Sequence, residues 1–246
     1  MEASFVKDYF EKAGVVDDYA FAVDRVGLWE SERLIIATYL QKSSKILELG
    51  CGSGRISINL ARLGYESLEA SDFSQNMVDS AKNLGEYYNL PVNFRVEDAT
   101  LIADRQDSSF DGVIFGFNGL MQIPKRENRL KCLKRVRQIL KAGGIFIFTT
   151  HDRDVARNKE YWDKEKELWQ SQKMSSALDE FGDKTYESEH GKLFIHSPAE
   201  TEILEDIATT NFKLEMNTWR SLIAVENEAV REFSDDCRFW VVSKQI

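Results

Sequence analysis

The sequence has few cysteines, no long apolar run and no basic leader. Its three cysteines, Cys51, Cys132 and Cys237, are odd in number and far apart, which argues against a disulfide framework or a zinc site and fits a reducing cytoplasm. No apolar stretch approaches the roughly 18 residues that a membrane-spanning helix needs. Residues 1–8, MEASFVKD, lack the basic segment and apolar core of a secretory signal. We therefore expect a cytoplasmic protein with no metal site and no membrane anchor.

Excess positive charge is also missing from this chain of 246 residues. It carries 41 acidic and 32 basic side chains, for a formal net charge of −9, whereas an enzyme that acts on nucleic acid usually presents a basic face. The densest basic stretch, residues 125–141, has helical spacing, and we interpret it as the solvated side of a helix. With 43% hydrophobic and 30% charged residues, the composition suits one globular α/β domain. Nucleic acid is therefore disfavoured as a partner.

The most informative stretch is residues 46–55, ILELGCGSGR. An apolar run, interpreted as a buried strand, ends around Glu48, and a helix is expected to open at Arg55. Three glycines lie between them at alternate positions: Gly50, Gly52 and Gly54. Glycines let a ligand lie against bare backbone, and the helix N-terminus offers unpaired N–H groups. A dinucleotide site would need a glycine where Arg55 stands. Cys51 is expected to be a small side chain packed under the turn rather than a nucleophile.

Acidic residues follow the next two predicted strands. Residues 67–71 are interpreted as a strand that runs into Asp72, about 20 residues past the glycine turn, where a carboxylate can accept hydrogen bonds from a ribose diol. Ser74 can cap the helix that comes next. Residues 92–96 alternate like a third strand, and Asp98 follows it. The pattern is therefore typical of a Rossmann-like half that binds a nucleoside.

Two further segments complete the pattern. Residues 111–119 are expected to form a fourth strand and its turn, and residues 140–144, LKAGG, precede an apolar strand at 145–150. These motifs, in this order and spacing, resemble those of class I S-adenosylmethionine-dependent methyltransferases over roughly residues 30–150. One departure is Ala142, where the family usually has proline.

The resemblance implies S-adenosylmethionine as cofactor and S-adenosylhomocysteine as product. In the family, the first acidic residue holds the ribose and the second often receives the adenine amino group, which corresponds to Asp72 and Asp98 here. By the same resemblance, the end of the fourth strand passes under the methionine part. The cofactor site is thus expected to comprise Tyr19, Glu48, Gly50, Cys51, Gly52, Gly54, Asp72, Phe73, Met77, Asp98, Ala99, Gly116 and Phe117.

Several of these residues have a second interpretation. Glu48 is expected to orient the glycine turn by bonding backbone N–H groups rather than to touch the ligand. Asp72 could be a helix-entry residue, and Asp98 a solvated loop carboxylate. Met77 and Tyr19 could serve in core packing.

The resemblance also implies the fold. We expect an α/β protein, a three-layer α/β/α sandwich around a Rossmann-like seven-stranded mixed sheet with the strand order 3-2-1-4-5-7-6. Residues 212–219 and 238–243 are expected to be its antiparallel sixth and seventh strands. The chain, 1–246, is expected to be a single domain with an N-terminal helical lead-in at 1–42 and a cap insertion at 152–192 over the acceptor pocket.

The cap and its exit have their own local signals. Residues 159–171 are predicted to be a helix, and residues 175–192 a loop or hairpin. Residues 192–196 are predicted to be a strand. Residues 197–200, SPAE, predict a capping box with Pro198 at the first helical position.

Methyl transfer by in-line displacement to a small-molecule acceptor is the predicted reaction, because aromatic residues of the cap can line a buried pocket. His151, directly after the fifth strand, is either a general base or a hydrogen-bonded strand-end residue. Asn118 either orients the acceptor or bonds the backbone of its turn. Tyr161 and Trp162 are expected to line the acceptor pocket, and Trp169 to pack within the cap.

Three other functions remain open at this stage. The chain could methylate protein or RNA, although Phe117-Asn118-Gly119 stands where many nucleic-acid methyltransferases have an asparagine-proline-proline-aromatic motif. It could be a non-catalytic S-adenosylmethionine-binding module that acts through a partner. A nicotinamide oxidoreductase is disfavoured by Arg55, which replaces the last glycine of the dinucleotide motif.

Overall fold

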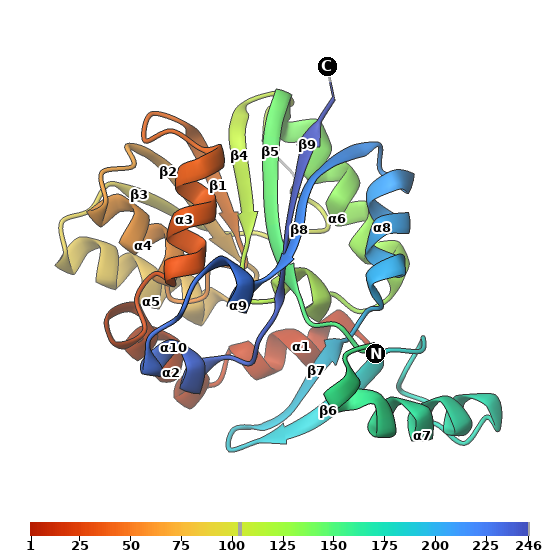
Figure 1. Ribbon diagram of the computed structural model, residues 1–246. Helices are drawn as coiled ribbons and strands as arrows, with labels where there is room; N and C mark the ends of the chain where they lie inside the picture. Colours follow the sequence, from red (N-terminus) through yellow and green to blue (C-terminus); the bar gives the residue numbers. More distant parts are fainter. Residues whose placement is uncertain (103–104, 246) are drawn as a thin grey trace.

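A mixed β-sheet forms the centre of the molecule (Figure 1). The structure is a computed structural model that describes residues 1–102 and 105–245. Seven strands lie in the order β3-β2-β1-β4-β5-β9-β8, and β9 runs antiparallel to both of its neighbours. The strands are β1 (Lys45–Leu49), β2 (Ser67–Asp72), β3 (Val92–Val96), β4 (Phe110–Phe115), β5 (Leu140–Thr150), β8 (Phe212–Trp219) and β9 (Arg238–Lys244). Counted along the chain within this sheet, the order is 3-2-1-4-5-7-6, which confirms the prediction.

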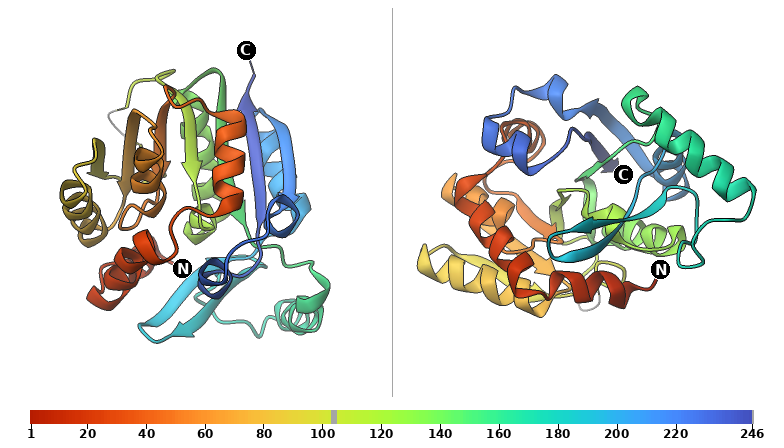
Figure 2. Two further views of the ribbon diagram at one scale, coloured as in Figure 1. Left: turned by 60° about the vertical axis from the view of Figure 1, so that its left-hand side comes forward. Right: turned by 90° about the horizontal axis from the view of Figure 1, so that it is seen from below.

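Helices cover both faces of the sheet (Figure 2). Ile46 packs on one face with α3 (Glu30–Tyr39) and α4 (Arg55–Arg62). Leu47 and Leu49 point to the opposite face, because successive side chains of a strand alternate. There they pack with residues of α6 and α8, whose bounds are Arg126–Ile139 and Glu200–Thr209. The three-layer α/β/α sandwich is therefore confirmed.

Local sequence signals determine where the helices before and after β2 begin. The turn into α4 holds Gly54 at a φ of +92°, a backbone conformation that a side chain would strain. The next helix, α5 (Gln75–Tyr87), is capped by Ser74, whose hydroxyl accepts a hydrogen bond from the Met77 N–H at 3.1 Å. Each helix therefore begins shortly after the carboxyl end of a strand, α4 after β1 and α5 after β2.

The N-terminal helices and the cap lie at one end of the sheet. They are α1 (Ala3–Phe10), α2 (Ala13–Arg25), α7 (Lys159–Gln170), and a hairpin of β6 (Asp183–Ser188) and β7 (Gly191–His196). The right-hand view of Figure 2 shows the hairpin crossing the same end of the molecule as α1 and α2. Leu193 and Phe194 of β7 share an apolar cluster with Val6, Tyr9 and Phe10 of α1. Short helical turns complete the chain: η1 (Gly119–Gln122), η2 (Ala156–Asn158), α9 (Arg220–Ile223) and α10 (Glu228–Phe233).

Two local predictions need correction. The helix α8 begins at Glu200, not at Pro198. Its N-cap is Ala199, whose N–H donates to Glu202 Oε2 at 3.0 Å, so only half of a capping box forms. The reason is that the carbonyl oxygens of Ser197 and Pro198 both accept hydrogen bonds from Arg153, which holds this segment outside the helix.

The basic helix is also less solvated than expected. Arg129 of α6 is 2% exposed, and its guanidinium pairs with Glu180 of the cap at 2.9 Å. Arg126 pairs with Asp206 of α8 at 2.7 Å, and Arg135 with Asp107 at 2.7 Å. Their helical spacing gave no sign of these partners, because all of them come from distant parts of the chain.

Two further findings concern the environment of the chain. All three cysteines are buried free thiols. Among the described residues, no helix has the length and apolar character that a membrane crossing requires.

Candidate active site

A cavity of about 330 Å³ lies beyond the carboxyl ends of four parallel strands. Its floor comes from Gly50 to Gly52 after β1, Asp72 and Phe73 after β2, Asp98 to Thr100 after β3, and Phe115 to Phe117 at the end of β4. Open α/β sheets bind ligands in this crevice, where the strand order reverses between β1 and β4. The structure thus brings eleven of the thirteen predicted cofactor residues to one cavity: Tyr19, Glu48, Gly50, Cys51, Gly52, Asp72, Phe73, Asp98, Ala99, Gly116 and Phe117.

Gly54 and Met77 do not line this cavity. The Met77 side chain is fully buried and packs in the cluster that joins α1 to the hairpin. Gly54 lies one step behind the turn, where an added Cβ would meet Ile58 at 3.0 Å and Phe94 at 3.2 Å. Gly54 therefore allows Ile58 and Phe94 to pack closely behind the turn. The position of Met77 favours the core-packing interpretation.

Asp72 holds the glycine turn and faces the cavity. Its Oδ2 accepts from the Gly52 N–H and its Oδ1 from the Ser74 N–H, both at 2.9 Å. Burial raises the pKa of this carboxyl to about 6. Each oxygen of a carboxylate has a further lone pair, so the group can still accept from a ribose diol.

Glu48 acts on the first turn of α4. It accepts hydrogen bonds from the Ser57 N–H at 2.9 Å and from the Ser57 hydroxyl. Burial raises the pKa of Glu48 to about 8, although these two hydrogen bonds oppose the shift. Its partners are groups of the protein, and this favours a role in orienting the turn.

Asp98 and Phe73 line the other end of the cavity. Asp98 Oδ1 accepts from both the N–H and the hydroxyl of Thr100 at 2.7 Å, while Oδ2 makes no hydrogen bond among the described residues. The Phe73 ring lies 6.2 Å from that of Phe10 on α1. A flat aromatic base would find both an apolar face and a free acceptor oxygen here.

Aromatic rings close the opposite end. An added Cβ on Gly52 would stand 2.7 Å from the Tyr19 ring, so the turn and α2 approach as closely as glycine permits. Burial raises the pKa of the Tyr19 phenol. The rings of Phe117 and Phe233 stack at 4.8 Å. Phe117 and Asn118 both have φ near +50° to +60°, which is strained for residues other than glycine and is common at functional sites.

The cavity wall also includes residues that were not predicted, and three of them stand out. Phe10 of α1 and Phe233 of α10 line it, but they belong to no motif and reach the cavity only through tertiary packing. Arg55 lines it too, and its guanidinium makes two hydrogen bonds to Glu32 at 2.7 and 2.6 Å. Its place directly behind the last glycine was the one available signal.

A second cavity, of about 310 Å³, lies at the end of β5. His151 lines it, and His151 Nε2 is 3.3 Å from Asn118 Nδ2. Burial lowers the pKa of His151, and the charge of Lys184 lowers it further, which favours the neutral imidazole. Cap residues contribute Asp152, Val155, Arg157, Asn158 and Lys184 to its wall.

The predicted aromatic acceptor residues line neither cavity. Trp162 is 6% exposed and meets the rings of Tyr161 and Phe181 edge-on at 5.0 and 5.7 Å. Tyr161 is 45% exposed. Their ring faces lie 5.8 and 5.9 Å from Lys184 Nζ, so their link to the second cavity runs through this lysine.

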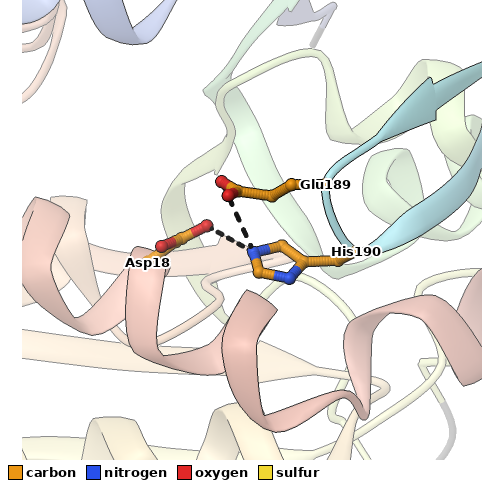
Figure 3. A group of neighbouring side chains, drawn as sticks. All are labelled: Asp18, Glu189 and His190. Carbon is orange, nitrogen blue, oxygen red and sulfur yellow. Dashed lines mark hydrogen bonds and ion pairs between the residues drawn. The ribbon is translucent and has the colours of Figure 1, made fainter.

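The tip of the hairpin contacts α2 (Figure 3). Together, α1 and α2 form the roof of the first cavity. His190 Nε2 lies 2.8 Å from Asp18 Oδ2 of α2 and 3.8 Å from Glu189. Nearby, Lys12 Nζ donates to the His190 carbonyl at 2.6 Å, and the Tyr9 and Ser188 hydroxyls are 2.9 Å apart. The cap thus holds α1 and α2, which supply Val6, Phe10 and Tyr19 to the cavity.

Known proteins share both the sequence pattern and the fold. Residues 46–144 match a family described as a methyltransferase domain. A demethylmenaquinone methyltransferase of Leptospira interrogans is 30% identical over 170 residues, which cover 65% of this chain and 64% of the relative. A carboxy-S-adenosyl-L-methionine synthase of Campylobacter fetus is 28% identical over 60% of this chain and 61% of that protein. The chain therefore spans less than two thirds of the length of these curated relatives.

Among solved structures, an S-adenosylmethionine-dependent methyltransferase of Methanosarcina mazei superposes with a TM-score of 0.69. It is 21% identical and is covered over 97% of its length by 86% of this chain. The chain therefore shares the fold of this methyltransferase, and its residues 46–144 carry the sequence pattern of a methyltransferase domain. S-adenosylmethionine is the cofactor of such methyltransferases. The cavity fits it, because the glycine turn, the buried Asp72 and the aromatic end all line the same space.

Proposed function

We propose that the protein transfers a methyl group from S-adenosylmethionine to a small-molecule acceptor. The observation that carries this proposal is the roofed cavity at the carboxyl ends of β1, β2 and β4. It joins a glycine turn held by Asp72 to an aromatic end formed by Tyr19, Phe117 and Phe233. Relatives with the same domain catalyse more than one kind of reaction, as the carboxy-S-adenosyl-L-methionine synthase illustrates, so the reaction itself needs testing.

The mechanism follows from what these residues can do. The bound cofactor supplies a methyl group that is already activated by its sulfonium. In the proposed transfer, the acceptor's lone pair would form the new bond to the methyl carbon while the carbon–sulfur bond would break and leave its electron pair on sulfur. The protein has to align the two groups and exclude water, which can supply several kcal/mol. If the acceptor carries a proton, the His151 imidazole, whose neutral form burial favours, could accept that proton from a molecule in the second cavity.

Charge pairing supports a small acceptor over nucleic acid. The most basic helix, α6, directs Arg126, Arg129 and Arg135 into ion pairs with acidic side chains of the protein. Paired guanidiniums are poorly placed to neutralise phosphates. The three buried free thiols also support our placement of the protein in a reducing compartment such as the cytoplasm.

The test is a methyl-transfer assay with trideuteromethyl S-adenosylmethionine. The purified chain is incubated with separate small-molecule, protein and RNA fractions, and both S-adenosylhomocysteine and the deuterated product are measured by mass spectrometry. We expect label in the small-molecule fraction. Gly52→Val, which drives a side chain into the Tyr19 ring, is expected to abolish it. Label only in protein or RNA, or binding of S-adenosylhomocysteine without any transfer, would reject the proposal in favour of a macromolecular substrate or a non-catalytic module.

A further inference from the structure

The two cavities share a wall at the turn after β4. Phe117 and Gly119 line the first cavity. Asn118, between them, lies with its amide 3.3 Å from the imidazole of His151, which lines the second cavity. Asn118 is 4% exposed, and its Oδ1 has no hydrogen-bond partner among the described residues. A buried polar atom without a partner is costly. Asn118 lines neither cavity itself, but it links the turn at the first cavity to His151 at the second.

A second segment borders both cavities directly. Phe233, at the end of α10, lines the first cavity, and Asp235 and Asp236 line the second. The two cavities are therefore connected at two places that are distant in sequence, through the Asn118–His151 contact and through residues 233–236. This arrangement places the second cavity beside the aromatic end of the first, where the methionine part of the cofactor is expected.

The second cavity is polar almost throughout. Its lining residues are His151, Asp152, Val155, Arg157, Asn158, Lys184, Ser197, Trp219, Asp235 and Asp236. Only Val155 among them has no polar side-chain atom. An apolar acceptor would leave these groups without partners, and each unpartnered group costs free energy.

The charges in this wall are unevenly paired. Asp152 pairs with Arg238 at 2.9 Å, and Asp236 pairs with Arg220 at 3.9 Å and also accepts from the Ser221 hydroxyl at 2.7 Å. Within residues 1–102 and 105–245, Lys184 and Arg157 have no ion-pair partner. Asp235 is the one lining carboxylate in that part of the chain without a hydrogen bond or ion pair. Two cations against one carboxylate leave an excess of positive charge.

Lys184 is held in place for contact with a ligand. Its ammonium lies over the rings of Tyr161 and Trp162 at 5.9 and 5.8 Å, which fixes the long side chain. Burial lowers the pKa of Lys184, opposed by the charge of Asp235. A partly desolvated ammonium that forms no direct ion pair with the described residues gains most from a ligand that brings an anionic group into contact.

We propose that the second cavity binds the acceptor, and that the acceptor carries an anionic group, such as a carboxylate, that contacts Lys184 and Arg157. This inference rests on the proposed methyl transfer. Asn118 is then a positioning residue that holds His151 beside the turn of the first cavity. The acceptor's nucleophilic atom reaches the methyl group past the Asn118–His151 pair, and a displaced proton passes to His151 or to water.

The test divides the small-molecule fraction by charge. A metabolite extract is separated by anion exchange into retained and unretained pools, and each pool is incubated with the full chain and trideuteromethyl S-adenosylmethionine. We expect label in the retained, anionic pool. In Lys184→Gln, the KM for the labelled compound is expected to rise about 10- to 100-fold, which is the range for a lost hydrogen bond between charged groups. Lys184→Arg is expected to recover part of this loss.

Lys192→Gln is the matched control. Lys192 is an exposed lysine of β7 that pairs with Glu187 at 3.5 Å and lines neither cavity. The KM of the Lys192→Gln variant for the labelled compound should therefore stay at the wild-type value. S-adenosylhomocysteine affinity and Tm should be unchanged in both glutamine variants. Label confined to the unretained pool, or an unchanged KM in Lys184→Gln, would overturn the inference and leave methyl transfer standing. Label in neither pool would instead overturn the proposed function, and this inference with it.

Discussion

The Oδ2 atom of Asp72 accepts a hydrogen bond from the Gly52 N–H at 2.9 Å, which joins the end of β2 to the glycine turn after β1. One carboxylate therefore shapes the turn and faces the cavity. Asp98 has a smaller part, because among the described residues its side chain accepts hydrogen bonds only from the neighbouring Thr100.

Asp72→Ala is expected to weaken S-adenosylhomocysteine binding more than Asp98→Ala. Loss of Asp72 removes the contact with a ribose diol and leaves the Gly52 N–H unpaired, at a cost of about 1.5–3 kcal/mol. Calorimetric titration of both variants gives the order directly. An Asp72 variant with wild-type affinity would show that this acidic position does not bind the ligand.

S-adenosylhomocysteine is expected to raise the Tm of the protein, and NAD is not. Arg55 stands where a dinucleotide motif has its last glycine, and its guanidinium is fixed by Glu32 and lies 4.9 Å from the Trp29 ring. A ligand at about 100 times its Kd stabilises the native state by roughly 2.7 kcal/mol, which thermal shift detects. Stabilisation by NAD alone would contradict the assignment of the cavity.

The floor of the site was predictable because it depends on local signals, and the strand order because the motifs resemble those of a known family. The glycine turn, Asp72 and the Ser74 cap each follow from residues close together in the chain. In parallel sheets, the ends of neighbouring strands then meet at one edge. Knowledge of the strand order was therefore enough to bring Gly52, Asp72, Asp98 and Phe117 together.

The roof and the acceptor side were not predictable in the same way. Phe10 and Phe233 line the same cavity although most of the chain separates them and neither belongs to a motif. Arg129 pairs with Glu180 only because the cap folds against α6. Aromatic composition pointed to Trp162 as a pocket residue, whereas the cavity near it is lined by Lys184. Patterns within one segment do not report which distant segment will cover it.

Glu48 is expected to make stability depend on pH. Its pKa of about 8 in the folded state lies above the value of about 4.5 expected for the unfolded chain, so the native state binds the extra proton. The associated stability is fully present below about pH 4.5 and is lost as the pH rises through 8. Glu48→Gln should flatten this decline by on the order of 1–3 kcal/mol.

Urea unfolding at pH 5 and pH 8.5 measures this effect. Exposed Glu66 provides the control, since Glu66→Gln should follow the wild-type dependence. A Glu48→Gln variant with the same decline as the wild type would mean that the buried carboxyl titrates normally.

His190→Ala is expected to speed the release of S-adenosylhomocysteine. The His190–Asp18 contact at 2.8 Å joins the hairpin to α2, and α1 and α2 form the roof of the cofactor cavity (Figure 3). Loss of one hydrogen bond of about 0.5–1.5 kcal/mol corresponds to a roughly 2- to 12-fold faster dissociation. Stopped-flow displacement measures the rate, with the exposed hairpin variant Glu187→Gln as control. Equal rates in the wild type and both variants would show that the hairpin does not hold the roof.

Trp162→Ala is expected to lose stability first and acceptor binding second. The side chain is 6% exposed and packs edge-on against Tyr161 and Phe181, so its truncation should cost about 3–5 kcal/mol of unfolding free energy. Its ring also lies 5.8 Å from Lys184 Nζ, so the KM for an anionic acceptor should rise even where the protein stays folded. Trp162→Phe keeps an aromatic face and should retain most of the stability and most of the acceptor binding. Thermal unfolding and the acceptor KM separate the two effects, because a side chain that contacted the acceptor directly would change KM with little loss of stability.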